Sequence, residues 1–325
     1  MQRSSGKARA QLVGAIMFLF AAAAAPLLPD WVVSLTTIAF ANALVVLGLV
    51  VLWRAGLVSF GQALYYCIGA YAVALTARWT GFTDAIALVL IGGVAAGLVA
   101  VLIGFLLARY REIFFAMLSL ALSMILYGVL VKTESLGSTD GFSVATPTFF
   151  GYAPHGEMLG RSLYWLTLAV DAVAAVLIGV YFRSVAGSLA APIRDNEIRV
   201  EFLGVSVTSI IHTKVVIAGI LGGLGGALAA MAIGHVDPNM SYWTTSGGFV
   251  FVTILAGAGS VAAAFIGSLV FEAVRSFAVD FMPQLWQMTL GSVLLLTILF
   301  LPDGLGSLLA RLQRRGEAKA PGAGP

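Results

Sequence analysis

The chain has 325 residues, of which 60% are hydrophobic and only 10% are charged. Apolar runs of about 20 residues recur from end to end, and a run of that length spans the hydrocarbon core of a bilayer as a helix, so the chain is a polytopic membrane protein. The formal net charge of +3 gives no support to nucleic-acid binding, because the Lys and Arg residues lie mostly in short clusters between apolar runs. The single cysteine, Cys67, excludes a disulfide framework and a cysteine-based metal site.

The apolar runs predict an all-α fold of about ten transmembrane helices in one domain over residues 1–325. The expected spans are Gln11–Leu28, Trp31–Trp53, Gly56–Ala77, Asp84–Ala108, Ile113–Lys132, Ser162–Phe182, Thr213–Gly234, Thr245–Gly259, Val261–Ala278 and Leu285–Leu301. The run Thr245–Gly259 is short for a crossing, so it either spans fully or is broken or re-entrant. The first run also fits a signal peptide, but Pro26 and Pro29 lead directly into the second span and favour a retained first one.

Positive charge sets the orientation of these spans, because cytoplasmic loops of membrane proteins carry an excess of Lys and Arg. With the N-terminus inside, every Lys and Arg lies on the inner side except Arg78, Lys132, Arg161 and Arg275. An odd number of spans would move the basic tail Arg311–Lys319 to the outside. We therefore expect a multi-pass protein with both termini in the cytoplasm.

A few polar side chains fall inside the expected spans. Such groups are costly in a membrane and by default indicate a functional site or a specific partner. Asn42, Gln62 and Asp171 are of this kind, and they either line a path through the bundle or hydrogen-bond across helices. Glu272 and Arg275, three residues apart on one helix, are expected to form a structural ion pair near the outer interface.

The two main outer segments contain turn signals. The larger loop covers residues 133–161, and the second begins a turn at Asp237. Glu134, Asp140 and Asp237 are candidate contacts for an extracytoplasmic partner, and simple connection of the spans explains the loops equally well. At the other end of the chain, residues 312–325 are expected to be disordered.

The polar loop 183–212 contains a short charged stretch with the signals of a helix. Pro192 suits a first helical turn, and Gly204 suits the position just past the end, which predicts one helix over Pro192–Leu203. Its polar residues include Arg194, Asp195, Asn196, Glu197, Arg199 and Glu201. Asp195 with Arg199, and Arg194 with Glu197, have the spacing of helical ion pairs, and Ile193, Val200 and Leu203 share one face. Such a helix is suited to contact with another protein, although an ordinary solvated loop fits the composition as well.

Glycines mark two expected helix contacts. Pairs four residues apart recur in the seventh span and once in the fourth: Gly219 with Gly223, Gly222 with Gly226, and Gly93 with Gly97. Small residues at this spacing let two helix backbones approach closely in lipid, which predicts tight packing there. Close smooth faces also suit helices that shift past each other.

Several activities have no motif in this chain. It contains no Gly-x-x-x-x-Gly-Lys-[Ser/Thr] run, so it is not expected to bind ATP in a P-loop of its own. His155, His212 and His235 are scattered and form no His-Glu-x-x-His zinc motif. No grouping of Ser, His and Asp stands out either, so we expect no metal site and no catalytic residues.

Over nearly its full length the chain resembles the permease subunits of bacterial ABC importers for branched-chain amino acids, the LivM type. The stretches that carry the resemblance are Gly56–Tyr71, Ile113–Leu122, Ser138–Phe142, Ile193–Gly204 and Asp237–Gly247. The glycine-rich span that follows the cytoplasmic motif in this family corresponds to Gly219–Gly226.

The resemblance implies a half-transporter in the bacterial inner membrane. Such a permease works with a sister permease of the LivH type, two cytoplasmic ATPase subunits, a periplasmic solute-binding protein and the surrounding lipid. ATP and Mg would bind to the partner ATPase, with no cofactor in this chain. The coupling helix of the family corresponds to Pro192–Leu203, and the coupling role would extend to Gly204.

The implied solute is a branched-chain or similar small apolar amino acid. Relatives also import urea, short amides or aromatic acids, and two departures allow for a different substrate. Gln62 stands where many relatives have His, and Leu136–Asp140 lacks the paired glycines that often precede the Asp. An ion-coupled secondary transporter or channel with Asp171, Glu272 and Arg275 as coupling charges is the alternative from another class. A membrane scaffold without transport is a third.

Overall fold

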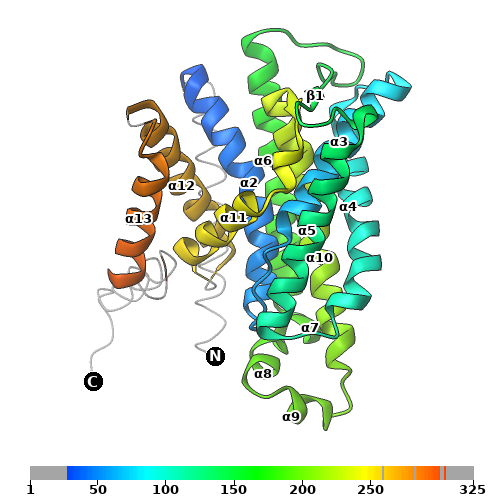
Figure 1. Ribbon diagram of the computed structural model, residues 1–325, viewed down its shortest axis with the longest axis vertical. Coiled ribbons are helices and arrows are strands. Elements are labelled where there is room, and N and C mark those ends of the chain that lie inside the picture. The colour runs from blue at the N-terminus through cyan, green and yellow to red at the C-terminus, as the bar shows by residue number, and fades with distance from the viewer. Residues whose placement is uncertain (1–27, 258–259, 282, 301–303, 305–325) are drawn as a thin grey trace, which may run out of the picture.

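The computed structural model describes residues 28–257, 260–281, 283–300 and 304. The longer helices are α2 (Asp30–Trp53), α3 (Gln62–Thr80), α4 (Ala85–Leu107), α5 (Glu112–Lys132), α6 (Glu157–Tyr181), α10 (Val207–Ile233), α11 (Trp243–Ala256), α12 (Val261–Phe281) and α13 (Trp286–Phe300). The short elements are η2 (Glu134–Leu136), α7 (Val185–Ser188), α8 (Ala190–Asp195), α9 (Glu197–Glu201), η3 (Pro238–Ser241) and the strands β1 (Phe142–Ser143) and β2 (His235–Val236). In Figure 1, β1 lies at one end of the bundle and α8 and α9 lie at the other.

Six helices of the described part of the chain are long and apolar enough to cross a membrane, namely α2, α4, α5, α6, α10 and α12. The prediction of a mostly helical polytopic membrane protein is therefore confirmed, whereas the number of about ten crossings is not established. Helices α11 and α13, with 14 and 15 residues, are shorter than a typical crossing. The first predicted span, up to residue 27, and the tail 312–325 lie outside the described residues.

The span predicted at Gly56–Ala77 is only partly helical. Helix α3 begins at Gln62, and residues 57–61 run inside the bundle without helical structure. The hydroxyl of Ser119 on α5 accepts one backbone N–H of this stretch at 3.1 Å, and Ser246 on α11 accepts another at the start of α3 at 3.1 Å. Non-helical backbone is tolerated at membrane depth only where the protein satisfies its polar groups, so these serines allow the chain to enter the bundle before α3 begins.

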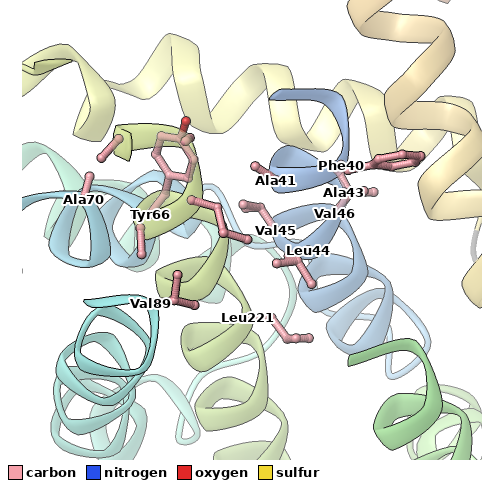
Figure 2. Packing of buried hydrophobic residues seen from close by; sticks show 14 of the residues in the cluster. Phe40, Ala41, Ala43, Leu44, Val45, Val46, Tyr66, Ala70, Val89 and Leu221 are labelled. Atoms are coloured by element: carbon pink, nitrogen blue, oxygen red, sulfur yellow. The ribbon is translucent and has the colours of Figure 1, made fainter. Parts of the chain in front are cut away.

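Helix α10 is the centre of the bundle and packs against α2, α3 and α4. Helix α2 is equally enclosed, because its residues from Ala43 to Leu52 are all buried. A helix that is apolar on all sides is expected to lie within protein and not to present one face to water. Figure 2 shows Val45 of α2 together with Tyr66 of α3 and Leu221 of α10 in one buried cluster.

The glycines predicted to pack helices line the contacts of α10: Gly219 and Gly223 toward α4, Gly222 and Gly226 toward α3, and Gly93 and Gly97 from α4 toward α10. The closest approach is at Gly226, where an added Cβ atom would collide with the carbonyl oxygen of Tyr66. Absence of a side chain thus lets two helix backbones touch, which strengthens their packing in lipid. Movement of the helices along these faces stays a prediction.

We expect Gly226→Ala to destabilise the protein by about 1–3 kcal/mol, because the methyl group has no space between α10 and α3. Gly128→Ala on α5 is the matched control, since an added Cβ there meets nothing within 4 Å, and it should be neutral or stabilising by up to about 1 kcal/mol. Labelling of the buried Cys67 by a thiol-reactive dye during heating in detergent measures the unfolding midpoint. A Gly226→Ala midpoint equal to that of Gly128→Ala would contradict the packing argument.

Candidate functional site

The helix predicted over Pro192–Leu203 is two short helices, α8 and α9. Asn196 separates them in an extended conformation, with φ −162° and ψ 100°, and its side-chain oxygen accepts the N–H of Arg199 at 2.9 Å. An Asn in this role caps the next helix and interrupts the preceding one, so the prediction of a single helix is wrong. Gly204 ends the segment with φ +80°, a conformation that glycine adopts without strain.

The charges of this segment do not pair along a helix surface as predicted. Within the described part of the chain neither Asp195 with Arg199 nor Arg194 with Glu197 forms an ion pair, and Arg194 lies 3.8 Å from Asp195 instead. Glu197 pairs with Arg111. The Nη2 atom of Arg111 donates to Oε1 of Glu197 at 2.7 Å, and its Nε atom donates to Oε2 at 2.8 Å. This two-pronged geometry is the strong form of a carboxylate–guanidinium contact.

Arg111 also holds its own loop, since its Nη1 donates to the carbonyl oxygens of Ala108 at 2.6 Å and Tyr110 at 2.9 Å. One guanidinium therefore ties the connection between α4 and α5 to α9. Sequence reasoning missed Arg111, because the neighbouring Arg109 has the same charge in the same basic loop and nothing in the pattern distinguishes the two.

The segment also rests against the connection between α2 and α3. The side chain of Arg194 lies over Gly56, which has φ +78°. Nearby, the guanidinium of Arg54 lies 4.1 Å from the ring centroid of Phe182, and burial lowers the pKa of that guanidinium. Residues 190–204 therefore contact the loops of two different helix pairs.

Apolar side chains of the segment divide into two groups. Ile193 and Val200 are buried in a cluster with residues of the α2–α3 connection, as the sequence predicted. Leu203 was expected on the same face, and that prediction is wrong, because its exposed fraction is 74%. Together with Phe202 (87% exposed) and Ile198 (65% exposed) it forms an apolar surface that we call the docking face.

The polar groups predicted at membrane depth do not form one cluster. Gln62 is fully buried at the start of α3, and its Nε2 donates to the carbonyl oxygen of Ala218 at 3.4 Å. Asp171 is fully buried on α6, and neither carboxyl oxygen has a hydrogen-bond partner among the described residues. Asn42 lines a cavity. Across residues 28–257, 260–281, 283–300 and 304, no group of three His, Cys, Asp or Glu side chains is placed to hold a metal ion.

At the opposite end of the bundle the two loops predicted to be outer join through β1 and β2, with Phe142 opposite Val236. The carboxylate of Asp237 accepts the N–H of Asn239 at 2.7 Å and so shapes the turn of η3. Asp140 and Glu134 are exposed in the other loop. These residues lie together at one end, and contact with a partner stays a prediction.

The cavity that Asn42 lines has a volume of about 410 Å³ and lies toward the β1–β2 end, between α2, α11, α12 and α13. Its polar lining includes Asp237, Ser268, Glu272 and Arg275. Glu272 and Arg275 form the ion pair that the sequence predicted, with Arg275 Nη1 at 3.2 Å from Glu272 Oε1. The pair therefore faces an open space as well as the protein interior.

Comparison with known proteins places this chain among membrane permeases. The family model for the branched-chain amino acid transport system permease component matches residues 31–300. The chain is similar to the high-affinity branched-chain amino acid transport system permease protein LivM of Salmonella typhimurium, at 27% identity over 288 residues that cover 80% of this chain and 67% of the relative. It is similar to LivM of Escherichia coli with the same identity and coverage. No solved structure matches this chain.

We expect Arg111→Gln to loosen α9, because it removes the charged contact that ties this helix to the α4–α5 connection. Backbone amides of residues 197–204 should exchange with deuterium about fivefold faster, equivalent to about 1 kcal/mol for a partly exposed pair. Arg109→Gln is the matched control and should leave the exchange unchanged. The double variant Arg111→Glu with Glu197→Arg reverses the charges and should restore the protection of these amides. Unchanged exchange in Arg111→Gln would show that the ion pair does not stabilise α9.

Proposed function

Because this chain belongs to the family of branched-chain amino acid transport permeases, we propose that it forms the path by which an ATP-driven importer carries branched-chain or similar small apolar amino acids across the bacterial inner membrane. Its homologues are permease components of transport systems and not enzymes, and ATP hydrolysis lies in a separate subunit. The chain is accordingly the membrane permease subunit of an ABC importer, a class that works with ATPase and binding-protein partners.

The observation that carries the coupling part of the proposal is the docking face next to the Arg111–Glu197 contact. Exposed aromatic and aliphatic side chains at a bundle end are suited to fill a groove on another protein. In our proposal a groove on the ATPase binds Phe202 and Leu203. When the ATPase dimer closes, it displaces α9. The ion pair then moves the α4–α5 connection, and the buried Ile193 moves the α2–α3 connection.

The proposed orientation has the docking face in the cytoplasm and the β1–β2 end outside. It is supported by the excess of Lys and Arg at the docking-face end and by the separation of the two ends along the bundle. Both termini would be cytoplasmic, the partner on the outside would be a periplasmic binding protein that contacts Glu134 and Asp140, and the second membrane subunit would be a LivH-type permease.

The function is tested by leucine uptake into proteoliposomes that contain the chain, its sister permease, two ATPases and the binding protein. We expect uptake that requires ATP, stops with vanadate and persists with an uncoupler. Uptake that collapses with the uncoupler and persists without ATP would establish an ion-coupled transporter instead, and Asp171→Asn would then abolish it. ATP-driven uptake of urea, amides or aromatic acids, with no uptake of leucine, would reassign the substrate alone.

We expect Phe202→Ser with Leu203→Ser to weaken capture of the ATPase subunits at least about tenfold, because both side chains are exposed apolar anchors of the docking face. Val185→Ser is the matched control, since Val185 is 77% exposed near the same end but lies outside the docking face. Co-purification over a range of ATPase concentrations measures the effect. Equal capture by both variants would place the ATPase contact elsewhere.

A further inference from the structure

The cavity between α2, α11, α12 and α13 is lined by both charged and apolar side chains. Glu272 and Arg275 of α12 supply charges of opposite sign, and Asp237 adds a second carboxylate. The apolar lining includes Phe249 and Val252 of α11, Phe271 of α12 and Leu290 of α13. A volume of about 410 Å³ falls in the range of pockets that enclose small ligands.

Among the described residues, Arg275 leaves most of its hydrogen-bonding capacity unused, while the carboxylate of Glu272 is also hydrogen-bonded by the side chain of Asn42. Both hydrogen bonds from Arg275 to Glu272 start at the single nitrogen Nη1, at 3.2 and 3.5 Å, while the guanidinium carries five N–H donors in all. The side chain of Glu272 is 11% exposed and that of Arg275 is 47% exposed, so the arginine reaches from the wall into the open space. A carboxylate entering the cavity would find planar donors on Arg275, and an ammonium group would find the carboxylate of Glu272.

Two further polar atoms at the cavity lack partners. Ser268 is only 2% exposed, and its Oγ has no hydrogen-bond partner among the described residues. The Oδ1 atom of Asn42 is also buried without one in that part of the chain. Buried polar groups in folded proteins are nearly always hydrogen-bonded, so these two unpaired groups beside one cavity are available to a polar ligand or water once their side chains turn toward it.

We propose that this cavity is a transit site for a zwitterionic amino acid with an apolar side chain, held through its carboxylate by Arg275 and through its ammonium group by Glu272. Ser268 and Asn42 supply further hydrogen bonds to the charged end of the solute, and the rings of Phe249 and Phe271 contact its side chain. The inference rests on the proposed import function and assigns a place for the solute within this chain.

The site excludes solutes that lack one of these features. An amine without a carboxylate would meet Arg275 as a like charge, and a carboxylate without an ammonium group would bring its negative charge beside Glu272 with no positive charge of its own to offset it. A polar zwitterion would lose contact with the apolar lining. The charge pair and the apolar lining together thus select a zwitterion with an apolar side chain, which neither feature alone would distinguish from other solutes.

The test uses photo-leucine, a zwitterionic leucine analogue with a diazirine in its side chain, on the full chain assembled with its partner subunits in nanodiscs. Irradiation should crosslink the analogue to peptides that contain Phe249, Val252, Phe271 or Leu290, and mass spectrometry locates the sites. Excess leucine should suppress these crosslinks, while 3-methylbutylamine, 4-methylpentanoate and serine should suppress them at least about tenfold less effectively. Leucine-sensitive crosslinks confined to other peptides, or none at all, would overturn the proposal.

Variants separate binding at the cavity from folding. Arg275→Gln should lower the leucine-sensitive crosslinking about tenfold, Ser268→Ala should lower it less, and Arg275→Lys should retain part of it. Arg161→Gln is the matched control, since Arg161 forms ion pairs with Asp30 and Glu157 and does not line the cavity. The unfolding midpoint from Cys67 labelling identifies any variant that fails to fold, and a folded Arg275→Gln with full crosslinking would contradict the assigned role.

Uptake measurements separate failure of this site from failure of the import function. ATP-driven leucine uptake with no photo-leucine crosslinks in the cavity would overturn the transit site and leave the import function intact. Leucine-sensitive crosslinks in the cavity of a complex whose uptake ignores ATP would support the site and overturn the ATP-driven mechanism. Loss of crosslinks in a complex that shows no ATP-driven uptake of leucine, urea, amides or aromatic acids would overturn both.

Discussion

The arrangement of this permease depends on the close contact of α10 with α3 and α4. In lipid, apolar burial gives helices little reason to associate, so packing and polar contacts must hold them. Glycines at 219, 222, 223 and 226 remove the side chains that would separate the backbones, and a carbonyl oxygen of α3 lies directly against Gly226. Helix α2 closes the other side of α10. The proposed functional features, the docking face and the cavity, lie outside this core, at the bundle ends and among the remaining helices.

A second constraint is the hydrogen bonding of backbone that is not helical. Residues 57–61 enter the bundle without helical structure, and the hydroxyls of Ser119 and Ser246 accept N–H groups there and at the start of α3 that no preceding helical turn satisfies. These two serines belong to α5 and α11, so the start of α3 depends on helices far away in the sequence. Two-residue strands and short helices, by contrast, occur at the bundle ends, where loops can satisfy their own backbone groups.

The sequence was sufficient for features that depend on local composition and helical spacing. Apolar runs predicted the longer helices of the described region, apart from the non-helical start of the run Gly56–Ala77. The glycine spacing predicted tight helix contacts, and three-residue spacing predicted the pair Glu272–Arg275. Features that depend on residues distant in the sequence could not be predicted. The non-helical stretch before Gln62 and the first turn of α3 need serines from two other helices, and Arg111 acquires its role only because α9 lies beside its loop. The break at Asn196 had a local signal, the preference of Asn for helix starts, but the charge spacing across it favoured one continuous helix.

Helix α2 connects the two ends in a way that bears on transport. Near one end it contributes Asn42 to the cavity and packs along α12, which carries Glu272 and Arg275. Near the other end it runs into the connection with α3, where Ile193 and Val200 of the proposed coupling segment are buried. Since α2 is enclosed and closely packed, displacement of its inner end cannot be absorbed by soft surroundings, because protein interiors are dense and transmit strain. A push on α9 would therefore reach the walls of the cavity through a stiff helix, and the proposed transit site would open or close in step with the partner ATPase.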